Sequence, residues 1–184
     1  MKAHDPGLAR PEYVMHPYRV SIAFLGDAWG ALDVEVSDPE IGPDAHMRKE
    51  MDGELLRFGA HFGFGELQPV ELVDLEYQIA QKLHAVSDPA YVRAHDLVDL
   101  QLLWDAGPDL VNLHRLCMRT FDWRQRQAWP PLPLRPMDGW ELAYADARAE
   151  TEVDGQTLVM PDIVTAREWL SRIIDVITSS PVLD

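Results

Sequence analysis

The chain has 184 residues, 47% of them hydrophobic, a formal net charge of −15 and a single cysteine, Cys117. This composition excludes a disordered chain, a disulfide framework and a cysteine-based zinc site, and no apolar run reaches the roughly 18 residues that a membrane span needs. The N-terminal sequence MKAHDPGLARPEY has no apolar core like that of a signal peptide, so we expect a cytoplasmic protein with no membrane partner.

Two neighbouring strands are expected first. Residues 18–25 (YRVSIAFL) and 32–37 (LDVEVS) are rich in β-branched residues that nearly alternate with others, and Gly26, Asp27 and Gly30 separate the two runs. The pattern predicts an antiparallel pair. Residues 38–65 hold five glycines and the charged run MRKEM at 47–51, which is compatible with a loop and a short helix. A third short strand is expected over residues 67–72.

From residue 72 onward the apolar residues recur at helical spacing. They predict one helix up to Asp88, a second from Pro89 to Gly107 and a third over residues 109–124. Two more helices are expected over residues 140–150 and 162–178, after a stretch with four prolines, WPPLPLRPMDGW, that cannot be regular helix. We therefore predict an α+β fold, with a small antiparallel sheet in residues 1–72 and a helical bundle in residues 73–184 packed on it as one compact unit.

One lysine lies where an apolar residue is expected. On a helical wheel Lys82 falls about 20° from Leu75 and about 40° from Val86, on the shoulder of the apolar stripe. A charge in that place extends to water, pairs with a carboxylate, or faces a cleft in which its charge is used.

The second predicted helix carries two acidic residues, Asp96 and Asp99, on one face, although it is apolar nearly all round. Lys82 is the obvious partner for both, and Arg93, one turn earlier, is placed to meet Asp96. A functional site and an ion pair that only fixes the helix register predict the same geometry, so spacing alone does not separate them.

Two further features bear on chemistry. Asp33 and Glu35 alternate along a predicted strand and so share a face, where they could hold Mg²⁺ beside a phosphate or simply face solvent. Between His114 and Pro136 there are five arginines and one aspartate, so this segment is +4 and the remainder of the chain is −19. With Trp123 and Trp129 nearby, this basic segment could contact RNA phosphates and bases, or its arginines could be solvated.

The segment 75–103, LEYQIAQKLHAVSDPAYVRAHDLVDLQLL, resembles the lysine-helix and aspartate-helix motifs of the AbiEii/AbiGii toxin family of nucleotidyltransferases. These are the toxin halves of AbiE-type toxin–antitoxin pairs, and the MenT toxins belong to the same family. The matching positions are Glu76, Ala80, Lys82, Leu83 and Ala85, followed by Arg93, Asp96, Leu97, Asp99 and Leu100. The later TFDWRQRQAWPPLP and GWELAYADARAE are similar to the family's C-terminal helical region, so the resemblance covers about residues 18–175.

The resemblance implies Mg²⁺-dependent transfer of a nucleotidyl group from a nucleoside triphosphate, in the MenT branch to the acceptor end of tRNA. Lys82 and Asp96 would be catalytic, Lys82 and Arg93 would bind the nucleotide, and Asp33 and Glu35 would hold metal. The remaining assignments are supporting roles for Glu76, His95 and Asp99 and nucleic-acid contacts for Arg119, Arg124 and Arg126.

The sequence also departs from the family. Before Tyr18 it has neither the glycine–serine turn nor the strand with two aspartates separated by one residue, and position 95 is His where Lys or Arg is frequent in relatives. We therefore expect a partial nucleotidyltransferase fold that is incomplete or inactive alone, with a second chain supplying the missing part beside a cognate antitoxin. The alternatives are a catalytically dead relative that serves as a binding or antitoxin-contact module, and a helical domain in which the Lys82 cluster is only structural.

Overall fold

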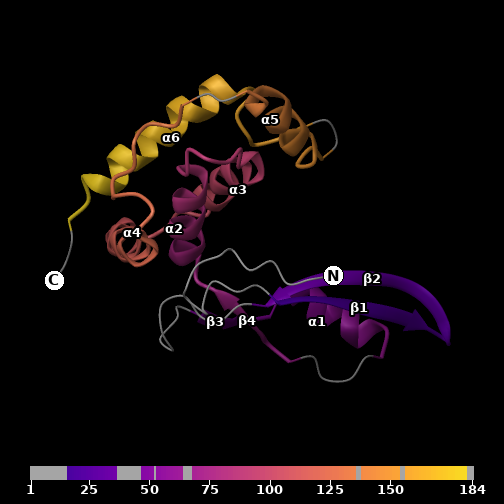
Figure 1. Cartoon of the computed structure of the whole chain (residues 1–184). Coiled ribbons are helices and arrows are strands. Elements are labelled where there is room, and N and C mark those ends of the chain that lie inside the picture. Colours follow the sequence, from indigo (N-terminus) through magenta and orange to yellow (C-terminus); the bar gives the residue numbers. More distant parts are fainter. Residues whose placement is uncertain are drawn as a thin grey trace. The chain divides into compact units, whose positions relative to one another are not determined.

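The computed structural model describes residues 16–36, 47–51, 53–63, 68–135, 138–153 and 156–181 of the chain. These residues form helices and small antiparallel sheets, which confirms the predicted α+β class (Figure 1). The contacts within the chain divide it into two compact units, residues 1–45 and 46–184. The expected division into a β region and a helical region at residue 72 stays a prediction. None of the helices in the described residues is both long and apolar enough to cross a membrane.

The first unit contains the predicted antiparallel pair, a hairpin of β1 (His16–Phe24) and β2 (Asp27–Val36). Leu25 and Gly26 form its two-residue turn with φ angles of 53° and 92°, the left-handed geometry that matches the twist of a hairpin. The register shifts where Ile22 faces Gly30, which produces a bulge near the turn.

The second unit begins with β3 (Met47–Glu50), α1 (Gly53–His61) and β4 (Val70–Val73). β3 pairs with β4 in antiparallel register, so residues 47–50 of the charged run form a strand that was not expected. Pairing with a distant segment outweighs the weak local preference of such residues. The short helix expected within residues 38–65 is found as α1. The third predicted strand is found at 70–73; Leu67, its expected start, lies outside the described residues.

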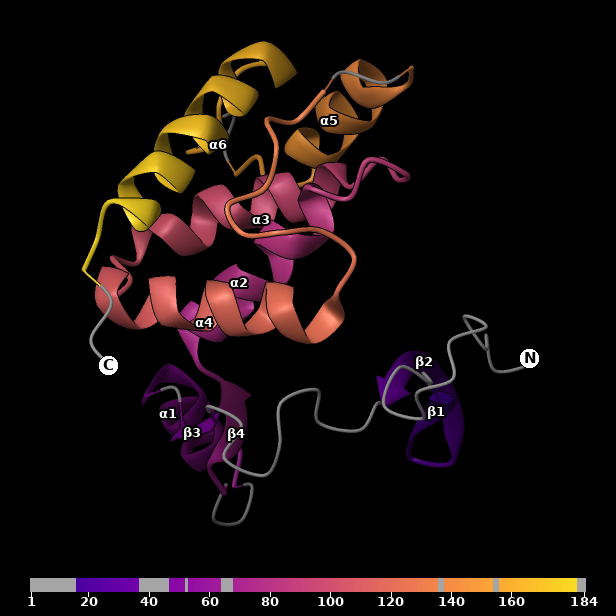
Figure 2. The same cartoon turned by 60° about the vertical axis from the view of Figure 1, so that its left-hand side comes forward.

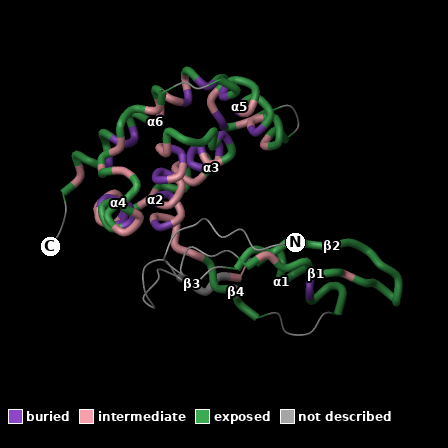
Figure 3. The backbone as a smooth tube through the Cα atoms, viewed as in Figure 1, coloured by how far each residue is buried: buried purple, intermediate pink, exposed green. Residues whose placement is uncertain are grey.

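Five helices follow, and they hold the core. They are α2 (Leu75–Val86), α3 (Ala94–Asp105), α4 (Leu110–Arg124), α5 (Trp140–Ala149) and α6 (Ile163–Thr178). α2 packs against both α3 and α4, while α3 contacts α5, and α6 contacts α4 and α5 (Figures 1 and 2). The largest fully buried side chains lie on these helices, among them Ile79, Leu97, Leu116, Phe121, Trp140 and Tyr144. Figure 3 shows buried positions spread over these five helices, whereas β1 and β2 are mostly exposed.

The second helix begins later than predicted. Pro89 does not lie in its first turn, because the Asp88 side chain accepts a hydrogen bond from the backbone N–H of Ala90 at 2.9 Å and closes a separate turn. The helix starts at Ala94. Aspartate side chains commonly stabilise such turns at the expense of helix.

A polar network ties α3 to α5 inside the core. The Gln101 amide donates to Tyr144 Oη at 3.2 Å and to the Leu97 carbonyl at 2.9 Å, and its oxygen accepts from the backbone N–H of Met160 at 2.8 Å. Tyr144 in turn donates to the Met160 carbonyl at 2.9 Å. Buried polar groups persist only when they are bonded in this way, so the network fixes the chain before α6 against the core.

The start of α4 offers a test of local stability. Asp109 precedes the helix, and its carboxylate accepts hydrogen bonds from the backbone N–H groups of Val111 and Asn112 at 2.9 and 3.3 Å. We expect Asp109→Ala to lower the free energy of unfolding by about 1 kcal/mol in urea titrations. Asp109→Asn, whose amide oxygen can accept the same bonds, should lose only a fraction of that. Equal losses in both variants would contradict the capping role.

Candidate functional site

Lys82 lies between two carboxylates of the neighbouring helix. Its Nζ on α2 is 3.0 Å from Asp96 Oδ1 and 2.6 Å from Asp99 Oδ2, both on α3. Residues three apart share a helix face, so the two carboxylates converge on one ammonium. The ion pair expected from the sequence is therefore confirmed, while the catalytic and supporting roles of its members stay predictions.

The three side chains of this site are partly buried, each to a different extent. The side chain of Lys82 is 26% exposed, Asp96 is 20% exposed and Asp99 is 45% exposed. Burial alone lowers the pKa of Lys82, but the hydrogen bonds to Asp99 and Asp96 and the attraction of their charges outweigh it, so the pKa lies above its ordinary value. Lys82 is thus held as a cation that solvent still reaches.

Arg93 does not take the position expected for it. It precedes α3 with φ −118° and ψ 55°, so the spacing of a helical turn between residues 93 and 96 does not apply. Its guanidinium instead lies 5.5 Å from the centre of the Tyr91 ring, and the Arg93–Asp96 contact is not among those of the described residues. Its assignment to nucleotide binding stays a prediction.

Two residues with predicted supporting roles join other pairs of elements. Glu76 Oε1 accepts a hydrogen bond from the backbone N–H of Asp109 at 3.0 Å, which ties the first turn of α2 to the start of α4. His95 Nε2 lies 3.4 Å from Glu150 Oε2, and both side chains are 68% exposed. Exposed pairs of this kind contribute little to stability.

The carboxylates expected to hold metal lie on β2 in the first unit. Asp33 faces Arg19 across the hairpin at 3.3 Å, with both side chains about 70% exposed, and Glu35 lies opposite Pro17. Within the described ranges there is no group of three or more His, Cys, Asp or Glu side chains that could hold an ion. Asp33 thus already faces a cation on its own hairpin, and the assignment of Asp33 and Glu35 to metal binding stays a prediction.

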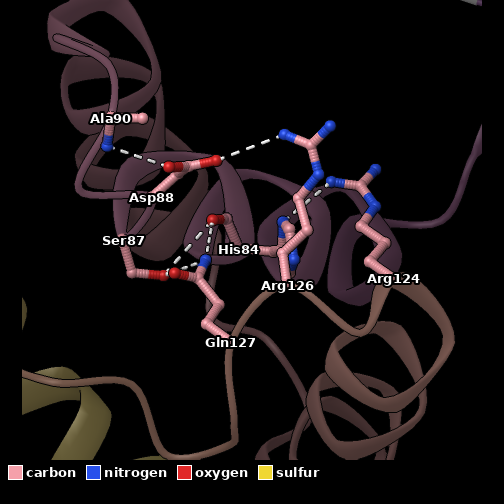
Figure 4. Close-up of polar contacts among 7 residues, drawn as sticks. All are labelled: His84, Ser87, Asp88, Ala90, Arg124, Arg126 and Gln127. Carbon is pink, nitrogen blue, oxygen red and sulfur yellow. Dashed lines mark hydrogen bonds and ion pairs between the residues drawn. The ribbon is translucent and has the colours of Figure 1, made fainter. Parts of the chain in front are cut away.

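Part of the basic segment turns toward α2. Arg124 Nη1 lies 3.2 Å from His84 Nδ1, and Arg126 Nη1 lies 3.4 Å from Asp88 Oδ2 (Figure 4). Gln127 Nε2 donates to the His84 carbonyl at 2.5 Å and to Ser87 Oγ at 3.0 Å. Arg119 is exposed on α4. Sequence reasoning missed the anchoring by Gln127, because loop residues carry no periodic signal.

The comparison with protein families gives this geometry a context. A family model described as nucleotidyl transferase AbiEii toxin, type IV toxin–antitoxin system, matches residues 11–174. The match defines a class of toxin that forms part of a toxin–antitoxin system and resembles nucleotidyltransferases. The chain belongs to the AbiEii toxin family. A search of curated proteins found no match.

The exposure of the side chains and the N–O distances make opposite predictions about which ion pair of Lys82 is the stronger. Asp99 is closer to Lys82, but Asp96 is better shielded from water. In double-mutant cycles with Lys82→Met, we expect about 1–2 kcal/mol of coupling for Asp96→Asn and less than about 1 kcal/mol for Asp99→Asn, because solvent screens exposed pairs. Asp105→Asn, at the end of α3, is the matched control and should show no coupling. A larger coupling energy for Asp99→Asn than for Asp96→Asn would show that the N–O distance, and not shielding from water, determines the strength of the ion pair.

The raised pKa of Lys82 has a consequence at high pH. A folded-state pKa above the unfolded value means that the ion pairs contribute fully below the unfolded pKa, and that this contribution is lost as pH rises through the folded one. Urea titrations from about pH 9 to about pH 11.5 should therefore show a loss of stability in the wild type that Lys82→Arg shows less, since guanidinium stays protonated. Identical profiles of stability against pH for the wild type and Lys82→Arg would show that the loss of stability does not come from deprotonation of Lys82.

Proposed function

We propose that this chain binds the phosphates of a nucleoside triphosphate at Lys82 and contributes to nucleotidyl transfer onto an RNA acceptor, with tRNA as the expected substrate. The observation that carries the proposal is the Lys82 ammonium, kept protonated by Asp96 and Asp99 and still 26% exposed. Membership of a nucleotidyltransferase toxin family supplies the reaction class.

The chemistry needs such a cation. In nucleotidyl transfer an acceptor hydroxyl attacks the α-phosphorus and forms a new P–O bond, its proton passes to water or a carboxylate, and pyrophosphate leaves with the electrons of the broken P–O bond. Negative charge builds on the leaving oxygens, and a fixed ammonium stabilises it. An incoming phosphate would displace one carboxylate from Lys82. The more exposed Asp99 is the partner that would give way, while Asp96 would keep the ammonium in place.

We further propose that turnover needs carboxylates that a second polypeptide supplies. The support is the donor set: the described acidic side chains of the site already neutralise Lys82, and Asp33 faces Arg19. The chain alone would then bind nucleotide without appreciable transfer. As a member of a toxin–antitoxin family, it is also expected to meet a cognate antitoxin.

The second candidate function is that of a catalytically inactive relative that binds the antitoxin or another protein. The same neutralised carboxylates favour it, because they would then serve only to hold α2 on α3. The two functions differ in nucleotide binding, which the inactive relative does not require.

A binding and transfer experiment separates them. Calorimetry with a non-hydrolysable nucleoside triphosphate should give saturable binding that Lys82→Ala weakens about tenfold or more, since a charge-assisted contact is lost. Arg172→Ala, which removes an exposed cation of α6, is the matched control and should bind like the wild type. The same proteins, incubated with labelled triphosphates, Mg²⁺ and total tRNA, should transfer little label alone. Binding that Lys82→Ala leaves unchanged would remove Lys82 from the nucleotide site.

A further inference from the structure

A pocket of about 490 Å³ lies at the end of α4, within the basic segment. Met118, Phe121, Asp122 and Gln125 line it from α4 and its cap, and they follow helical spacing. The loop that follows lines the pocket with Arg126, Gln127, Ala128 and Trp129. Its volume is within the usual range for small-molecule sites.

Contacts within the chain shape part of the wall of this pocket. Gln125 takes a left-handed conformation, with φ 51°, that ends α4 and turns the chain. Arg126 and Gln127 then bind the end of α2, as Figure 4 shows. The Trp129 ring makes an edge-type contact with the ring of buried Phe121, with ring centres 5.2 Å apart. The anchored Gln127 and Trp129 would therefore lose less freedom on binding than unanchored side chains would.

We propose that this pocket binds one nucleotide unit, with its base against Trp129 and Met118 and its phosphate at Arg126. Aromatic rings and soft thioethers favour the flat face of a base. Arg126 uses one terminal nitrogen on Asp88, at 3.4 Å, while its own side chain is 45% exposed, and its guanidinium carries further N–H donors that suit a phosphate. The pocket thus combines a flat surface for stacking with a cation at its rim.

The rim also predicts which bases are preferred. Asp122 is an exposed carboxylate that can only accept hydrogen bonds when ionised, so it suits an exocyclic amino group. Adenine, cytosine and guanine carry such a group and uracil does not. The Gln125 and Gln127 amides add both donors and acceptors. We therefore expect the pocket to favour amino-bearing bases over uracil.

The unit can come from a free nucleotide or from the end of an RNA strand. The choice of a nucleotide unit as the ligand of this pocket rests on the proposed function, since a nucleotidyltransferase must hold an acceptor as well as a triphosphate. The pocket nevertheless uses α4 and its loop and not Lys82, so the two sites can be tested independently.

The test measures binding of AMP, UMP and an adenosine-ended RNA trinucleotide to the full chain by calorimetry. Each ligand is measured against the wild type, Arg126→Gln, Asp122→Asn, Lys82→Ala and the control Arg172→Gln. We expect AMP or the trinucleotide to bind about tenfold more weakly to Arg126→Gln, and UMP to bind several-fold more weakly than AMP. Asp122→Asn should reduce that preference, while the control Arg172→Gln leaves binding within about twofold.

Each outcome bears on the proposal. Arg126-dependent binding of the trinucleotide alone identifies the source as an RNA end, and Arg126-dependent binding of AMP alone identifies a free nucleotide. Absence of saturable binding for both, or binding that Arg126→Gln leaves unchanged, overturns the proposal. Loss of AMP binding only in Lys82→Ala also overturns it, by placing the nucleotide at α2 and α3, and that result leaves the proposed function standing.

Discussion

The ammonium of Lys82, shared between Asp96 and Asp99, is the constraint on which the helical part of the chain depends. It fixes how α2 meets α3, and α2 in turn packs against α4. Without the cation, two carboxylates one turn apart would repel each other on a helix that is otherwise largely buried. An ion pair that is incompletely buried can serve structure and still exchange a partner, so the structural and the chemical interpretations of this cluster are compatible.

α2 carries two sets of contacts on different sides. One side presents Lys82 to α3, while His84, Ser87 and the turn at Asp88 receive the side chains that follow α4 (Figure 4). The loop that lines the proposed nucleotide pocket is therefore anchored on the helix that carries the proposed triphosphate site. In a transfer reaction, donor and acceptor must be positioned together, and a common rigid element is a simple way to achieve this.

The sequence predicted the elements and contacts that follow from a repeating pattern of residues. Alternation and glycine positions identified the β1–β2 hairpin, and helical spacing placed Lys82 opposite Asp96 and Asp99. It failed where a distant partner or a local turn decides: residues 47–50 become a strand by pairing with β4, and the turn at Asp88 delays the start of α3. The contacts of Arg126 and Gln127 were missed for a related reason, since loop conformation leaves no repeating pattern.

Lysine is scarce in this protein: its sequence holds Lys2, Lys49 and Lys82. Amine chemistry therefore has few targets, and one of them is the centre of the helical cluster. Acylation of that amine would erase its charge, add bulk between α2 and α3, and leave two neighbouring carboxylates without their shared counter-ion. Such a modification would therefore change both the packing of α2 against α3 and the binding of any polyphosphate at this amine.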